Sequence, residues 1–131
     1  MIGEDPMEKV EFEKKWLNTF APGLTDKQYN DCYIDQYLWH VFSYEVVFKE
    51  NVLTGDMARK AYNSIDKENA IMIQIWDDEV LEETEELPDE YKNWESIEDI
   101  PELFIVDKNW KWTYVSTHEN GWCGPYFYRI D

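Results

Sequence analysis

The sequence predicts an α+β domain in which an antiparallel or mixed sheet of about five strands carries helices from the N-terminal half of the chain. Apolar residues recur at helical spacing in the first half, and short apolar or alternating runs between turn residues fill the C-terminal third. The 131 residues suit a single domain, 1–131, because neither a repeat nor a Pro/Ser/Gly-rich linker divides them. With 44% hydrophobic and 17% aromatic residues, the chain can bury a core without a cofactor.

Two helices are predicted at the start. The apolar side chains between Glu8 and Phe20 form a helical stripe, which Ala21-Pro22-Gly23 ends. Thr25 and Gln28 fit a capping box, in which each side chain satisfies a free backbone donor of the other. A short second helix should therefore follow.

Tyr37 to Phe48 is predicted to be the first strand, because aromatic and β-branched residues occupy both of its alternating faces. Thr54 or Gly55 can cap the next helix. Its buried stripe would consist of Ala58, Ala61, Tyr62 and Ile65, with Arg59 and Lys60 towards water. Ala70 to Trp76 has an apolar centre and is predicted to be the next strand.

The C-terminal third is predicted to be a three-strand meander. Turns at Lys108-Asn109 and Asn120-Gly121 separate its strands. Because Pro125 cannot donate to a ladder, we expect the final strand at an edge of the sheet. The strands are Leu103 to Asp107, Trp110 to Ser116 and Cys123 to Ile130.

Negative charge is concentrated between Asp77 and Glu102. This segment holds thirteen acidic residues and a single basic one, Lys92, and so carries −12 of the net charge of −17. We expect a partly ordered acidic excursion over 77–102, in which a helix begins near Pro88 and Tyr91 and Trp94 anchor one short turn on the body.

The charge and the cysteine content limit the partners and the compartment. A sequence pI near 4.3 argues against direct binding to nucleic acid or an anionic membrane, whereas a basic protein partner is allowed. The first residues lack a secretion signal, and Cys32 and Cys123 allow at most one disulfide, so reduced thiols in a cytoplasm are expected. The most apolar stretch is far shorter than the roughly 20 residues of a membrane helix.

Trp122-Cys123-Gly124-Pro125-Tyr126 differs by one residue from the WCGPC box of thioredoxins. Tyr126 stands where the resolving cysteine would be, and the few residues after Cys123 are too short for the helix and strands of that fold. The match is therefore interpreted as false.

The Asn120-Gly121 turn suggests a sharper chemical pair. A two-residue type I′ loop places His118 opposite Cys123. The same register pairs Glu119 with Trp122, Tyr114 with Phe127 and Trp112 with Arg129. An imidazole beside a thiol could activate a nucleophile or bind a metal, although packing at the end of a strand pair is the simpler interpretation. A one-residue slip would put the two side chains on opposite faces.

No metal site is predicted. Zinc ligands could come from Cys32, His40, His118, Glu119 and Cys123, but their spacings match no zinc motif. His40 suits a core histidine and Cys32 a small buried hydrophobe. Asp77-Asp78-Glu79 lacks the alternating ligands and the glycine of a calcium loop.

Several segments resemble those of a family of small proteins of bacilli with no assigned function. They are Tyr37 to Ser43, Trp112 to Val115, Thr117-His118-Glu119 and Gly124 to Phe127. The resemblance implies a single-domain, bacterial, cytoplasmic protein and supplies no catalytic residues. In size, charge and meander the chain is also similar to bacterial toxin-immunity proteins, by shape and charge only.

Three functions are compatible with these features. The leading hypothesis is a non-enzymatic acidic binding or regulatory protein with a basic protein partner. Its candidate binding residues are Tyr91, Trp94, Glu82, Glu83, Glu85, Glu86 and Trp122. The alternative is a small enzyme with Cys123 as nucleophile, His118 as base and Glu119 orienting the histidine. The third is a purely structural or regulatory subunit.

Overall fold

The computed structural model describes residues 9–31, 40–43, 52–76, 79–84, 87–98, 100, 103–117 and 125–130. The strands are β1 (Val52–Thr54), β2 (Ala70–Trp76), β3 (Glu79–Thr84), β4 (Leu103–Asp107), β5 (Trp112–Ser116) and β6 (Tyr126–Arg129). Over the described residues they form one sheet of six strands in the order β1-β6-β5-β4-β2-β3, and every neighbouring pair is antiparallel. The α+β class and the meander β4-β5-β6 are confirmed.

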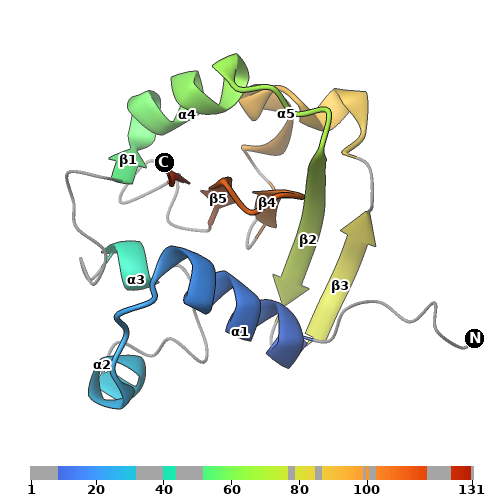
Figure 1. The fold of residues 1–131 in the computed structure, drawn as a ribbon. Helices are drawn as coiled ribbons and strands as arrows, with labels where there is room; N and C mark the ends of the chain where they lie inside the picture. Colours follow the sequence, from blue (N-terminus) through green and yellow to red (C-terminus); the bar gives the residue numbers. More distant parts are fainter. Residues whose placement is uncertain are drawn as a thin grey trace, which may run out of the picture.

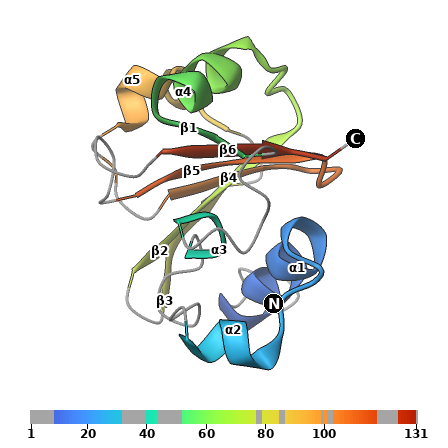
Figure 2. The ribbon, with the colours of Figure 1, turned by 90° about the vertical axis from the view of Figure 1, so that its left-hand side faces the viewer.

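Helices cover both faces of this sheet. They are α1 (Lys9–Phe20), α2 (Asp26–Asp31), α3 (His40–Ser43), α4 (Gly55–Ser64), the 3-10 turn η2 (Asp89–Tyr91) and α5 (Trp94–Ile97). Figure 1 shows the sheet between α4 and α1, and Figure 2 shows α4 and α5 on one side of β4, β5 and β6 with α1 and α3 on the other. Among the described residues, no helix has both the length and the apolar composition needed to cross a membrane.

The core on the α1 side of the sheet, the α1-side core, is aromatic. Phe12, Trp16 and Phe20 recur every four residues and are 0%, 0% and 1% exposed, which confirms the predicted stripe. The Trp16 ring packs against Phe42 and Phe104 with centroid distances of 5.4 and 5.6 Å. These contacts hold α1 and α3 on the sheet.

The core on the opposite side, the α4-side core, combines aliphatic side chains with the rings of tyrosine, tryptophan and phenylalanine. Ala58 and Tyr62 of α4 are fully buried, as predicted. The ring of Tyr62 stacks on that of Tyr114 with a centroid distance of 4.3 Å. Because β5 carries Tyr114 and Trp112, this core joins α4 to the centre of the sheet.

The N-terminal capping box is confirmed. The backbone N–H of Thr25 donates to Gln28 Oε1 at 2.9 Å, and the backbone N–H of Gln28 donates to Thr25 Oγ1 at 3.1 Å. These bonds fix the start of α2, and they satisfy two donors that a helix end leaves free.

The predicted strand over Tyr37–Phe48 is wrong where it can be compared, because His40–Ser43 is helix α3. The rest of that range lies outside the described residues. Val41 and Phe42 are both buried in the α1-side core, which explains why these two positions are apolar although they belong to a helix. A short apolar run does not distinguish a buried strand from a buried helix. Among the described residues, the first strand of the sheet is β1, which pairs with β6.

The prediction that the final strand lies at an edge is also wrong, since β6 lies between β1 and β5. Pro125 precedes β6, so the donor that it lacks is not needed in the ladder. Its carbonyl oxygen accepts a hydrogen bond from the backbone N–H of Gly55 at 3.0 Å. Strand β1 then pairs with β6 from Val52↔Tyr128 onward.

The turn between β4 and β5 is longer than Lys108-Asn109. Asp107 closes it, because its carbonyl oxygen accepts from Trp110 N at 2.8 Å and its Oδ2 accepts from Lys111 N at 3.2 Å. Trp110 adopts the left-handed region, with φ of 59°. Strand β5 therefore begins at Trp112 rather than at the predicted Trp110.

Part of the acidic segment forms strand β3, which the sequence does not predict. It pairs with β2 from Met72↔Thr84 to Trp76↔Glu79, with a register shift between Gln74 and Ile75. A shift of this kind is typical of a β-bulge. In the described part of the sheet, β3 is the last strand on its side, and Figure 1 shows it at the margin of the molecule.

Candidate functional site

Arg59 joins α4 to α5. Its Nη1 donates to Asp56 Oδ1 at 2.8 Å, and its Nε and Nη2 donate to the two carboxylate oxygens of Glu98 at 3.2 and 2.5 Å. Its guanidinium carbon lies 5.1 Å from the centre of the Trp94 ring, and the side chain is only 13% exposed. The hydrogen bond to Glu98 raises the pKa of Arg59. The prediction that Arg59 points to water is wrong, because Glu98 reaches it from a distant segment.

Residues 87–98 of the acidic segment are held on the body of the protein by three further contacts. Tyr62 Oη donates to the carbonyl oxygen of Tyr91 at 2.5 Å, and Asn63 Oδ1 accepts from the backbone N–H of Trp94 at 2.9 Å. Ile97 is fully buried in the α4-side core. Residues 87–98 therefore have a defined place on the body of the protein.

Carboxylates project from this anchored segment and from the start of α4. They are Asp56, Asp89, Glu90 and Glu95, and together with Glu98 we call them the α4–α5 acidic face. The side chains of Asp56 and Asp89 are 87% and 95% exposed. A hydrogen bond from Lys92 at 2.8 Å lowers the pKa of Asp89. The face is thus a group of carboxylates attached to a fixed support.

The predicted binding residues have different positions. Tyr91 and Trp94 are half-buried and pack against the α4-side core, so they anchor the segment as expected. Glu82 and Glu83 belong to β3, where they pair with Gln74 and Ile73. Glu85, Glu86 and Trp122 lie outside the described residues.

The predicted chemical pair cannot be compared with the structure, because His118, Glu119 and Cys123 lie outside the described residues. Cys32 also lies outside them. The register on which the pair depends is confirmed, because Trp112 pairs with Arg129 and Tyr114 with Phe127. The juxtaposition of His118 and Cys123 stays a prediction.

His40 is 8% exposed and belongs to α3, which agrees with a core histidine. Across the residues that the structure describes, no group of three His, Cys, Asp or Glu side chains is arranged to hold a metal ion.

Two buried tyrosines and a buried lysine fix α4 in place: Tyr62 of α4 stacks on Tyr114 of β5, and Lys67 caps the C-terminal end of the helix. Burial raises the pKa of Tyr62 and of Tyr114 above the ordinary 10.0. The ammonium of Lys67 donates to the carbonyl oxygens of Tyr62 and Ile65 at the end of α4, and it lies 4.7 Å from the centre of the Tyr62 ring. Burial lowers the pKa of Lys67. A lysine just after a predicted helix is the signal from which this cap could be recognised.

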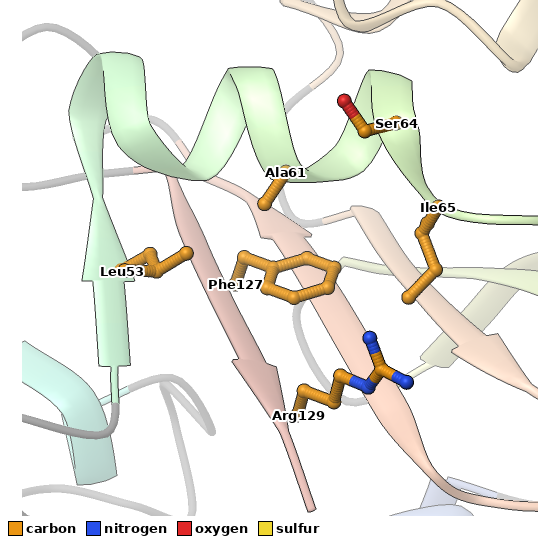
Figure 3. A pocket seen from close by; sticks show the side chains of 6 residues that line it. All are labelled: Leu53, Ala61, Ser64, Ile65, Phe127 and Arg129. Carbon is orange, nitrogen blue, oxygen red and sulfur yellow. The ribbon is translucent and has the colours of Figure 1, made fainter.

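A groove runs between α4 and strands β1 and β6, and we call it the α4–β6 groove. It consists of two adjoining hollows of about 350 and 220 Å³. The larger is lined by Leu53, Ala61, Ser64, Ile65, Phe127 and Arg129. The smaller is lined by Ile65, Asp66, Asn69, Asp107, Lys111, Trp112 and Arg129. Figure 3 shows Phe127 and Leu53 beneath α4, with the guanidinium of Arg129 on the side where Ile65 lies.

A family model matches residues 4–127 of the chain, which is nearly its whole length. The chain belongs to this family, the domain of unknown function DUF4275. No curated protein and no solved structure matches the chain. The expected resemblance to a family without an assigned function is thereby confirmed.

In this DUF4275 chain the match includes the α4–α5 acidic face and the positions of His118 and Cys123. It ends inside β6 at Phe127, two residues before Arg129. The apolar side of the α4–β6 groove therefore lies within the matched residues, and its Arg129 side lies beyond them.

Proposed function

We propose that this protein is a non-enzymatic acidic binding or regulatory protein that engages a basic protein partner. Its docking surface is the α4–α5 acidic face, and the candidate residues Glu82, Glu83, Glu85 and Glu86 precede this face along the chain. The observation that carries the proposal is the anchoring of residues 87–98 on α4, which gives the exposed carboxylates a fixed arrangement.

Anchoring matters because ordering a loop upon binding costs free energy. Surfaces that are already ordered avoid that cost, and complementary charge raises the rate of association. Asp89, Glu90 and Glu95 project from a segment whose apolar side chains are already packed, so a partner would meet them in place. The net charge of −17 would attract a basic protein from a distance.

The resemblance to proteins of bacilli supports a site of action in a bacterial cytoplasm. Analogy of shape and charge with toxin-immunity proteins supports a basic nuclease as the class of partner. A carboxylate surface of this kind would occupy the cationic groove with which such an enzyme holds nucleic acid.

The proposal is tested by titrating the protein with a panel of inactive basic nuclease domains, with lysozyme as a basic protein of unrelated fold. We expect a saturable, salt-sensitive complex with at least one nuclease. Replacing Asp89→Asn, Glu90→Gln and Glu95→Gln together should weaken it about tenfold, at roughly 0.5 kcal/mol for each charge.

The matched control is the triple variant Glu11→Gln, Asp26→Asn and Glu68→Gln. It removes three exposed carboxylates elsewhere on the chain and so changes the net charge equally. Equal weakening by the two triple variants would mean that only the net charge matters, and the α4–α5 acidic face would lose its assigned role.

A second candidate function is a small enzyme with Cys123 as nucleophile and His118 as base. It is favoured by the β5–β6 register, which is the register that places these residues opposite each other if the pairing continues. The rate of Cys123 alkylation as a function of pH tests it. An activated thiol would show a pKa well below 8.5, and His118→Gln would restore the ordinary value. An ordinary or raised pKa in the unmodified protein would rule out this enzyme.

A further inference from the structure

We propose that the basic partner adds an extended, Lys/Arg-rich segment to the sheet as a further strand, paired with the side of β3 that faces away from β2. We call this side the outer edge of β3. The inference rests on the proposed function, because it specifies how the basic partner is held. In the described part of the sheet, β3 has a hydrogen-bonded neighbour on one side only. Such an edge presents backbone donors and acceptors to an extended segment of another chain.

The ladder between β2 and β4 shows which backbone groups of β2 face which neighbour. The backbone N–H of Lys108 donates to the carbonyl oxygen of Asn69 at 2.6 Å, directly before the first registered pair of the two strands. Backbone groups of successive residues in a strand point to opposite sides. The odd-numbered residues of β2 are therefore directed at β4 and the even-numbered ones at β3.

This alternation identifies the outward groups of β3. Ile73 is opposite Glu83 and Ile75 is opposite Val80. Opposed residues of an antiparallel pair either exchange both of their hydrogen bonds or exchange none. Because both isoleucines are odd-numbered, the backbone N–H and C=O groups of Glu83 and Val80 point away from β2. These groups form the outer edge that a further strand would use.

The charge of β3 favours a basic segment over a second copy of this chain. Glu79, Glu82 and Glu83 make up half of its six residues. Pairing of two such edges would bring like charges together, and the register shift between Gln74 and Ile75 interrupts the regular ladder. Charges and bulges of this kind prevent like edges from pairing. Lysine or arginine residues on the added strand would instead be attracted to the glutamates.

The outer edge of β3 leads to the α4–α5 acidic face. Leu87 follows Thr84 by three residues and is buried in the α4-side core. Figure 1 shows β3 pointing towards α5. A partner whose extended segment pairs with β3 can therefore place the rest of its basic surface at residues 87–98.

The test uses a capped ten-residue peptide of alternating lysine and threonine, titrated into the full chain while amide chemical shifts are recorded. We expect saturable shifts and slower hydrogen exchange at the amides of Val80 and Glu83. The matched control is the same peptide with every backbone nitrogen methylated, which keeps the charge and removes the donors. It should bind at least about tenfold more weakly, since it cannot donate to β3.

Two variants at one position separate the backbone donor from the charge. Glu83→Gln and Glu83→Pro both remove one negative charge, but only proline removes the outward N–H. Proline is tolerated on an edge strand where its nitrogen faces away from the neighbouring strand. Glu83→Pro should therefore weaken binding of the unmethylated peptide at least about fivefold more than Glu83→Gln does. The comparison of the two peptides on the unmodified protein does not depend on how well the proline variant folds.

The outcomes separate strand addition from the proposed function. Equal affinities for the two peptides, or equal effects of the two variants, would overturn strand addition and leave the acidic face able to bind a basic partner by charge. Slow exchange at Val80 and Glu83 in the free protein would also overturn it, because the edge would already be covered. The absence of a complex with any basic nuclease would instead overturn the proposed function.

Discussion

The two faces of the sheet are packed in different ways. On the α1 side, rings meet mainly edge to face, and a buried side-chain bond from Trp16 Nε1 to Thr113 Oγ1 at 3.1 Å joins α1 to β5. On the α4 side, stacked tyrosines, the Arg59–Glu98 pair and Lys67 must each find a particular partner. The α1 side thus stabilises the fold mainly through the burial of aromatic rings, whereas the specific contacts on the α4 side determine where residues 87–98 lie.

The largest expected effect is on the α1 side. Trp16→Ala removes a fully buried ring that contacts three other aromatic rings, so the free energy of unfolding should fall by about 3–5 kcal/mol. Denaturant titration measures this. Trp94→Ala on the other side removes a half-buried ring and should cost less than half as much. Equal losses would contradict the difference between the two faces.

Alkaline pH should weaken the α4 side selectively. Burial raises the pKa of Tyr62 and of Tyr114 above the ordinary 10.0, so the native protein keeps two protons that the unfolded chain loses. The contribution of the two tyrosines to the free energy of unfolding is therefore fully present below pH 10. Above pH 10 the free energy of unfolding falls by about 1.4 kcal/mol per pH unit for each tyrosine. Lys67 offsets part of this fall, because its pKa is lowered.

Comparing Tyr114→Phe with the unmodified protein cancels the contribution of Lys67. Above pH 10, the free energy of unfolding should fall less steeply with pH in the variant, because one of the two tyrosine contributions of about 1.4 kcal/mol per pH unit is missing. An unchanged slope would mean that Tyr114 titrates normally in the native state.

A smaller effect is expected at the ion pair that fixes α5. Glu98→Gln removes the more buried of the two carboxylates that Arg59 contacts and leaves it paired with the exposed Asp56, so the free energy of unfolding should fall by about 1–3 kcal/mol. The exposed pair of Lys27 and Asp31 is the control, since Asp31→Asn should cost only about 0.3–0.5 kcal/mol. If both variants lose the same amount, Arg59 does not hold the segment.

The smallest effects distinguish the two stacked tyrosines. Tyr62→Phe removes the donor to the carbonyl oxygen of Tyr91 and should cost about 1 kcal/mol and make residues 87–98 easier to cleave by a protease. Tyr114 Oη has no hydrogen-bond partner among the described residues, so Tyr114→Phe should be neutral or slightly stabilising. Limited proteolysis with denaturant titration measures both. The reverse order of stabilities would be incompatible with these contacts.

Local patterns in the sequence predict what local physics determines. The α1 stripe, the Thr25–Gln28 box and the β5–β6 register each depend on spacing within a few residues or across one turn, and each is confirmed. None of these three features involves residues 87–98, whose position depends on contacts with α4.

Long-range contacts explain what the sequence does not predict. Val41 and Phe42 are apolar because they are buried, and burial suits a helix as well as a strand. Arg59 is covered because Glu98 approaches it from 39 residues away, which no local pattern indicates. The edge position was expected for β6 because Pro125 lacks a backbone donor. It is wrong because β1, whose three residues are too few to be recognised in the sequence, pairs with β6.

Hydrogen exchange, recorded for the protein alone and saturated with an inactive basic nuclease domain, tests the central claim most directly. We predict that the partner slows exchange of the amides in residues 87–98 and at the start of α4, and leaves α1 and α2 unchanged. Protection of α1 or α2 without protection of residues 87–98 would contradict the assignment of the α4–α5 acidic face as the docking surface.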